Sequence, residues 1–199
     1  MSFDTGIDHL FRHEWAVLEQ FINARQVASL SAEAKALWSQ GQFRPAWIGV
    51  EHMRHAEIRR DSTCWFADDP LPSQRELLQT FDGLRIELNS RGYLGLVDAE
   101  CHFARYDVGD FYVRHLDRFR ADDRRAVSAV LYLNEHWNAE DGGELRLFPR
   151  AADAVLVPPQ AGTLAMFMSE YVEHEVLPAR RERWSVAAWF RRCSVGVLA

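Results

Sequence analysis

The sequence predicts an α+β fold, with helices in the first part of the chain and an antiparallel β core after them. Apolar residues recur mainly at helical spacing up to about residue 95. After Gly92, short runs of β-forming residues alternate with turn clusters. No Pro-, Gly- or Ser-rich linker separates the two parts, so the 199 residues are expected to form one domain.

Three helices are expected in the first part. The segment 7–25 carries apolar residues at helical spacing. The segment 29–43 opens with Ser31, a candidate N-cap, and the segment 72–92 ends at Gly92, a residue that commonly stops helices. These helices are expected to pack on one face of the β core.

Eight short strands are expected after the helices, and the turns between them indicate a sandwich or barrel of antiparallel strands. The runs are 101–106, 111–116, 126–134, 144–148, 154–158, 162–168, 172–177 and 183–192.

Composition excludes several classes of function. The formal charge of −6 gives the chain no general attraction to nucleic acid or to an anionic membrane. No stretch of about 18 uncharged apolar residues is present, and the opening MSFDTGIDHLFRHEW lacks the basic and apolar regions of a secretory signal. Cys64, Cys101 and Cys193 form no CxxC spacing, which argues against a disulfide scaffold or a thiolate zinc site. We therefore expect a cytoplasmic protein.

His115 and Asp117, in the run FYVRHLDRF, are the first candidates for a metal site. Residues i and i+2 of a strand project to the same face, so both side chains can bind one ion. Chance alone gives roughly half of one His-x-Asp pair in a chain of this composition, so the pair needs support from elsewhere.

His174 and Arg183 provide that support. The run EYVEHEVLPARRERWSVAAWF is interpreted as strand, turn and strand, with the turn at 178–182, so a hairpin would place the two residues nearly opposite each other. Two histidines and one carboxylate on one face of a metal form the facial triad of non-heme Fe(II) oxygenases. Arg183 suits a carboxylate clamp beside it. Tyr132 shares a strand face with Ser128 and can hold the same carboxylate.

The motifs YVRHLD, LYLNEHW, GGELRLFP, and HEVLP followed by RWSVAAWF occur in this order between Ile58 and Trp189. With them the chain resembles the 2-oxoglutarate- and Fe(II)-dependent dioxygenases of the prolyl 4-hydroxylase group. It is similar in particular to the oxygen-sensing (HIF-type) prolyl hydroxylases and their bacterial counterparts. The resemblance implies a single dioxygenase domain over 1–199. Residues 96–192 would form a double-stranded β-helix (jelly-roll) core, and residues 1–95 would supply mainly helical support and a finger-like loop.

The resemblance also implies roles for individual residues. The metal ligands would be His115, Asp117 and His174. The residues that bind 2-oxoglutarate would be Arg183, Tyr132, Val176 and Trp189, with the first two on its 5-carboxylate. The residues that contact the substrate would be Tyr106, Tyr112 and Arg125, together with Arg59, Asp61 and Trp65 of the finger-like segment IRRDSTCWF.

The activity that the resemblance implies is hydroxylation of a prolyl residue in a protein, with O2 consumed and succinate and CO2 released. Fe(II) and 2-oxoglutarate would be the cofactors, and ascorbate the reductant. The partner would be a protein with a proline in an exposed loop, and a translation elongation GTPase is one candidate. Two alternatives stay open: the same chemistry on another side chain or a small metabolite, and a metal-free jelly-roll binding module.

Other histidines have simpler interpretations. His52 and His55 could form a second metal site, but a polar loop or strand is the better expectation. His9 and His13, four residues apart, suit an exposed helix face without the carboxylate of a zinc motif. His102 shares a strand face with Tyr106 and is expected either in the core or at the rim of a pocket.

Overall fold

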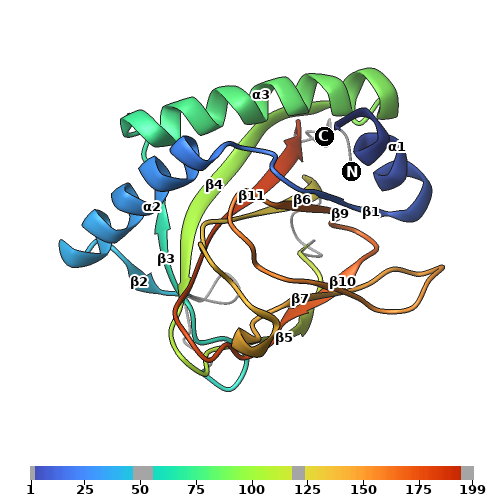
Figure 1. Ribbon diagram of the computed structural model, residues 1–199. Coiled ribbons are helices and arrows are strands. Elements are labelled where there is room, and N and C mark those ends of the chain that lie inside the picture. Colours follow the sequence, from blue (N-terminus) through green and yellow to red (C-terminus); the bar gives the residue numbers. More distant parts are fainter. Residues whose placement is uncertain (1–2, 47–55, 118–123, 194–199) are drawn as a thin grey trace, which may run out of the picture.

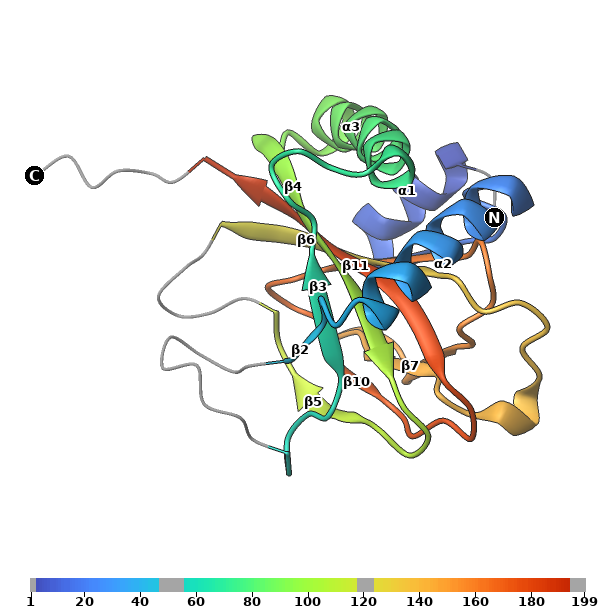
Figure 2. The same cartoon turned by 90° about the vertical axis from the view of Figure 1, so that its left-hand side faces the viewer.

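The computed structural model describes residues 3–46, 56–117 and 124–193 (Figure 1). Three helices lie together on one side of the described part: α1 (Phe3–His13), α2 (Ala24–Ser39) and α3 (Pro72–Gly92). None of these helices is both long enough and apolar enough to span a membrane. The helices cover one face of a large sheet, and a smaller sheet lies against its other face (Figure 2).

The larger sheet has the strand order β1-β9-β6-β11-β4-β3-β2, and the smaller has the order β5-β10-β7-β8. All pairs of neighbouring strands are antiparallel. The strands are β1 (Trp15–Leu18), β2 (Arg44–Pro45), β3 (Ser62–Trp65), β4 (Leu96–Tyr106), β5 (Tyr112–His115), β6 (Arg125–Tyr132), β7 (Leu145–Phe148), β8 (Val155–Val157), β9 (Leu164–Met168), β10 (Glu173–Val176) and β11 (Arg183–Arg192). The predicted α+β class is confirmed, and each of the eight predicted strands is present.

Two apolar clusters hold the layers together. On β11, Val186 and Phe190 point toward the helices and join the first cluster. On the strands of the larger sheet, every second side chain points instead toward the smaller sheet. Tyr132 of β6 and Phe167 of β9 are examples, and both belong to the second cluster. The candidate site lies in this second space, so the helices support the wall of the site without entering it.

The longest helix, α3, shows why the sequence attaches it to the sheet. Leu77, Phe81, Leu84 and Leu88 recur at helical spacing and are all buried. The ring of Phe81 contacts that of Phe190 on β11, with centroids 5.7 Å apart. The helix therefore packs directly on the strand that carries Arg183 at its other end.

The first predicted helix was wrong after His13. Residues Trp15–Leu18 form β1, which pairs with β9, because Glu14 adopts a left-handed conformation (φ 71°) that ends the helix. Ala16 and Leu18 are buried, so the apolar residues of this segment fit the period of two of a strand as well as helical spacing. Spacing over four residues does not separate the two structures.

The predicted hairpin between His174 and Arg183 was also wrong. Strand β10 lies in the smaller sheet and pairs with β5 and β7, whereas β11 lies in the larger sheet and pairs with β4 and β6. The connection crosses from one sheet to the other, and Leu177 N–H donates to the carbonyl of Glu144 at 3.0 Å on the way. Both strands already have two neighbours, so neither has a free edge for the other.

The N-cap of α2 lies eight residues before the predicted one. Asn23 caps the helix: its side chain accepts from Gln26 N–H at 3.0 Å, and the side chain of Gln26 accepts from Asn23 N–H at 3.1 Å. This reciprocal pair satisfies two amides that the first turn leaves free. Ser31 lies inside the helix.

We expect Asn23→Ala to lower the free energy of unfolding by about 1 kcal/mol, because it removes the N-cap. Ser31→Ala, in the helix interior, should change it by less than about 0.5 kcal/mol. Urea denaturation of both variants measures the difference. Equal losses for the two variants would contradict the assignment of the cap.

Candidate metal centre

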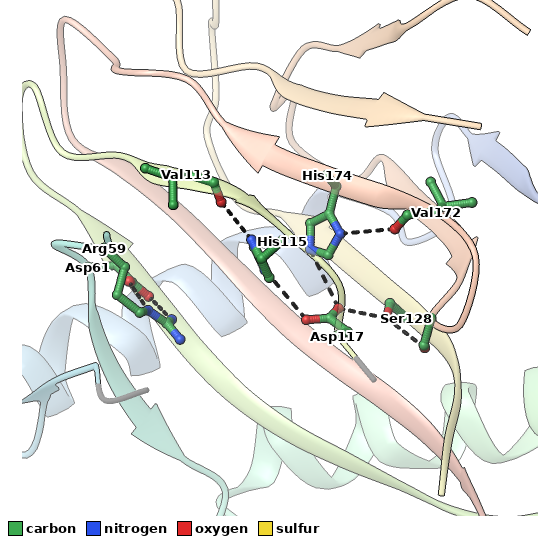
Figure 3. Close-up of polar contacts among 9 residues, drawn as sticks. Arg59, Asp61, Val113, His115, Asp117, Ser128, Val172 and His174 are labelled. Carbon is green, nitrogen blue, oxygen red and sulfur yellow. Dashed lines mark hydrogen bonds and ion pairs between the residues drawn. The ribbon is translucent and has the colours of Figure 1, made fainter. Parts of the chain in front are cut away.

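His115, Asp117 and His174 come together at one point between the two sheets (Figure 3). One ligand atom from each lies within 4.8 Å of the others. Nε2 of His115 and Nε2 of His174 are each 3.6 Å from a different oxygen of Asp117. The two imidazoles are direct cross-strand partners, with ring centroids 4.1 Å apart. Within the described residues, this is the group of three that could hold a metal ion.

Each imidazole is oriented by its own strand. Nδ1 of His115 lies 2.8 Å from the carbonyl oxygen of Val113, and Nδ1 of His174 lies 3.4 Å from that of Val172 (Figure 3). A carbonyl only accepts, so Nδ1 carries the proton in each ring and Nε2 is left with a lone pair. Both lone pairs face the carboxylate, as metal ligation requires.

Asp117 is held from the larger sheet. Ser128 Oγ on β6 donates to Asp117 Oδ2 at 2.7 Å, and Ser169 Oγ lies 2.8 Å from Ser128 Oγ. Both serines are buried. The carboxylate therefore joins the two sheets at the centre of the site.

The electrostatics of the triad favour a divalent cation. Burial acts to raise the pKa of Asp117, but the positive charge of His174 and His115 in their protonated forms and the hydroxyl of Ser128 outweigh it, and its pKa lies below the usual value. Burial lowers the pKa of His174 to about 4, against the attraction of Asp117. At neutral pH the site thus presents a carboxylate and a neutral His174, which are the protonation states that ligate metals. Two imidazoles and one carboxylate fit Fe(II).

Arg183 and Tyr132 end in polar atoms that the protein leaves without partners. Arg183 is 1% exposed; its Nε donates to the carbonyl of Gly143 at 2.9 Å, and Nη1 contacts Ser185 Oγ at 3.4 Å. Among the described residues, Arg183 Nη2 and the Tyr132 hydroxyl have no hydrogen-bond partner although both are buried. The guanidinium carbon lies 5.1 Å from the Tyr132 ring. A bound carboxylate would satisfy both groups, so the residues fit 2-oxoglutarate.

Three other predicted residues lie along the same space. Tyr106 is the cross-strand partner of Arg183, whose guanidinium carbon is 5.0 Å from its ring. Val176 is buried and shares the inward face of β10 with His174. Trp189 follows on β11, with the Arg125 guanidinium carbon 3.7 Å from its ring. Tyr106 and Val176 belong to the apolar cluster between the two sheets, and Trp189 projects from the same face of β11 as Arg183.

Apart from Tyr106, the residues predicted for substrate contact divide into two groups. Arg125 and Trp65 lie with Trp189: Arg125 pairs with Glu100 at 3.3 Å, and the Trp65 ring stacks on Trp189 at 5.9 Å with half of its surface exposed. The other group, Arg59, Asp61 and Tyr112, is tied to His115 and is largely enclosed.

His102 lies in the wall of the site. It is 3% exposed, its ring contacts Trp65 and Trp189, and its Nδ1 has no partner among the described residues. Burial lowers the pKa of His102 to about 3. The rings of His9 and His13 contact each other on α1 without a third ligand in the described part. His52 and His55, for which a polar loop or strand was expected in preference to a second metal site, lie outside the described residues.

Comparison with known proteins agrees with this geometry. The family model "2OG-Fe(II) oxygenase superfamily" matches residues 101–191. A Pseudomonas putida prolyl-4-hydroxylase of known structure is 44% identical, with a TM-score of 0.88, over 96% of this chain and 98% of that one. This chain belongs to the 2OG-Fe(II) oxygenase superfamily. The fold of the oxygenase is therefore the jelly roll predicted from the sequence, backed by helices.

Two further relatives of the oxygenase have names that refer to hypoxia-inducible factor. A Trichoplax adhaerens prolyl hydroxylase, solved with a peptide of the factor, is 25% identical with a TM-score of 0.88 over 94% of this chain and 88% of that one. The Caenorhabditis elegans hypoxia-inducible factor prolyl hydroxylase is 27% identical over 88% of this chain. The chain spans only 26% of that relative's length.

Several supporting residues of the oxygenase were not predicted. Ser128 was placed on the face of Tyr132 by its period of two, but its bond to Asp117 requires the other sheet to be known. Gly143 is a second case: its φ is +71°, and an added Cβ would lie 2.8 Å from Ala179 Cβ and 3.4 Å from Arg183 Cδ. A glycine in GGELRLFP is thus needed where its carbonyl holds Arg183.

We expect Ser128→Ala to weaken binding of Mn(II) about tenfold, because Asp117 loses the donor that orients it. Ser185→Ala is the matched control: this serine is equally buried but contacts Arg183, so Mn(II) affinity should stay within about twofold of the wild type. Electron paramagnetic resonance of free Mn(II) measures both. An unchanged affinity for Ser128→Ala would contradict the supporting role.

We also expect His102 to make stability depend on pH. In the unfolded chain its pKa is close to 6.5, and in the folded protein about 3, so the unfolded state takes up the proton first as pH falls. This costs about 2 kcal/mol of stability between pH 7 and pH 5. His102→Gln should reduce the pH dependence of the urea midpoint by that amount. His13→Gln, at an exposed position, controls for the loss of a histidine, and equal slopes in all three proteins would refute the assignment.

Proposed function

We propose that this protein is an Fe(II)- and 2-oxoglutarate-dependent hydroxylase that acts on a prolyl residue of a polypeptide, as a single domain in the cytoplasm. The observation that supports it best is the pair of buried, unpartnered groups, Arg183 Nη2 and the Tyr132 hydroxyl, beside a His-Asp-His triad. Leaving such groups unpaired costs free energy unless a ligand completes them. A metal-free binding module would not need this combination.

The triad would hold the metal, and the clamp would hold the far carboxylate of 2-oxoglutarate. When bound, Fe(II) and 2-oxoglutarate supply the chemistry that divides O2 between succinate and the hydroxylated product, with release of CO2. Arg183 fixes the direction of the cosubstrate because Gly143 and Ser185 hold its guanidinium. Val176 and the surrounding apolar cluster exclude water from the site. Ascorbate would serve as the reductant that keeps iron in the Fe(II) state.

A polypeptide substrate is favoured over a small metabolite by the groups at the edge of the site. Trp65 is half exposed and stacks on Trp189, whose own ring also lies against the guanidinium of Arg125. Flat aromatic surfaces of this kind suit a proline ring and its neighbours. The relative solved with a peptide supports the same class of substrate. A translation elongation GTPase with a proline in an exposed loop is our candidate partner.

The test is incubation of the purified protein with Fe(II), ascorbate, 2-oxoglutarate and a cell lysate, followed by mass spectrometry. Peptides that gain one oxygen at proline support the proposal, and gain at other residues supports the same chemistry on a different side chain. A small substrate would be favoured if 2-oxoglutarate is consumed without any modified peptide and a metabolite fraction of the lysate raises that turnover. No turnover of 2-oxoglutarate under any of these conditions would refute the oxygenase activity.

We expect Asp117→Asn to abolish 2-oxoglutarate turnover, because the triad loses its anionic ligand. Arg183→Gln should instead raise the KM for 2-oxoglutarate at least about tenfold, since it loses a charge-assisted contact to a carboxylate. Arg180→Gln, exposed in the connection before β11, is the control and should leave the KM unchanged. A KM for Arg183→Gln equal to that of the control would remove the clamp from the proposal.

A further inference from the structure

The segment before β3 is joined to the strand that carries His115. Arg59 and Tyr112 form an antiparallel bridge. Val113 N–H donates to the carbonyl of Ile58 at 2.9 Å, and Arg60 N–H donates to that of Phe111 at 3.1 Å. Backbone bonds therefore fix residues 58–60 against β5 at the point where the metal ligand follows.

The side chains continue this connection as a column that ends on the metal ligand. Asp61 accepts from Arg59 Nε at 2.8 Å and from Nη2 at 2.6 Å (Figure 3). The guanidinium carbon of Arg59 lies 4.3 Å from the centre of the Tyr112 ring. The Tyr112 ring in turn stacks on the imidazole of His115, with centroids 3.5 Å apart and planes at 17°.

The column is enclosed, so its contacts are strong. The Asp61 side chain has no exposed surface and that of Arg59 keeps 14%. Burial acts to lower the pKa of Arg59, but the charge and hydrogen bonds of Asp61 outweigh it and the pKa is raised, so Arg59 stays charged. A desolvated cation on an aromatic face attracts the ring more than an exposed one does. Each member is thus held by the next one.

We propose that Asp61, Arg59 and Tyr112 are positioning residues of the metal centre, which hold the imidazole of His115 in its ligating orientation. This rests on the metal centre of the proposed function and assigns the three residues to the metal ligand instead of to the polypeptide. His115 is the most exposed ligand of the triad. Its one described hydrogen bond is made by Nδ1, and one such bond does not stop the ring from rotating about it. The stacked ring of Tyr112 limits that rotation. By linkage, a metal ion that binds His115 also stabilises the bridge between residues 58–60 and β5.

Two variants separate positioning from simple electrostatics. Asp61→Asn leaves an uncompensated cation near the metal, whereas Arg59→Gln leaves an uncompensated carboxylate. If only charge mattered, the first would weaken metal binding and the second would strengthen it. Because both break the column, positioning requires that both weaken it, each by about tenfold.

The ring provides a second, independent pair of variants. Tyr112→Phe keeps the stacking face and should bind metal within about twofold of the wild type. Tyr112→Leu removes the face and should lose about tenfold. These two variants keep the test valid where loss of the buried ion pair prevents folding.

The experiment is titration of the purified protein with Co(II), followed by its visible absorption, with the free energy of unfolding measured in parallel without metal. Arg60→Gln is the matched control, because Arg60 is exposed and lies over Phe111 at 4.8 Å without contact to a ligand. Its affinity should equal that of the wild type. Hydrogen exchange of the Val113 amide should slow when Co(II) binds the wild type, and not in Tyr112→Leu.

The outcomes discriminate between the two proposals. If the wild type binds no Co(II), the metal centre of the proposed function fails and this inference fails with it. If the wild type binds and Arg59→Gln binds equally well or better, or Tyr112→Leu matches Tyr112→Phe, only the positioning role is overturned. Weakened binding in Asp61→Asn, Arg59→Gln and Tyr112→Leu, with Arg60→Gln and Tyr112→Phe unaffected, supports it.

Discussion

The antiparallel pairing of β5 with β10 is the constraint on which the candidate metal centre depends. It sets His174 directly opposite His115, and the register shifts before the next pair, Val176 and Tyr112. Because successive side chains of a strand point to opposite faces, a slip of one residue would turn His174 away from Asp117. The same four-residue strand also supplies apolar wall through Val176. Ligand geometry and pocket packing are thus fixed by one register.

Charge inside the barrel is tolerated because each charged group has at least one fixed partner. Asp117 is bonded by Ser128 from the larger sheet, and Arg183 is bonded by the carbonyl of Gly143. Both arrangements are incomplete without ligands, since Arg183 Nη2 lacks a partner within the described residues. Stability must therefore come from elsewhere, and the apolar cluster between the helices and the larger sheet supplies it. A site that is costly to fold is supported by a layer that takes no part in its chemistry.

The fold was predictable wherever one local signal decided it. Long helical periodicity gave α3, and β-forming runs bounded by turns gave the eight strands of the core. The errors occur where a local pattern fits two structures. Residues 15–18 suit helix and strand equally, and the edge of β9 decides for strand. The stretch that carries His174 and Arg183 has the pattern of a hairpin, and only the partners already present on both sheets make it a crossing.

The sequence by itself identified the residues of the candidate site: His115, Asp117, His174 and Arg183 were found from residue type, spacing and order. The hairpin predicted to bring His174 and Arg183 together was wrong, because Arg183 reaches the site from the opposite sheet. Only the tertiary structure decided what holds them. Asp117 is held by Ser128, and Arg183 by the carbonyl of Gly143. His115 is held by the ring of Tyr112, which itself carries the guanidinium of Arg59. Most of these contacts join segments that are far apart in the sequence. Such contacts depend on how strands and sheets pair in space, and residue spacing along the chain does not encode that pairing.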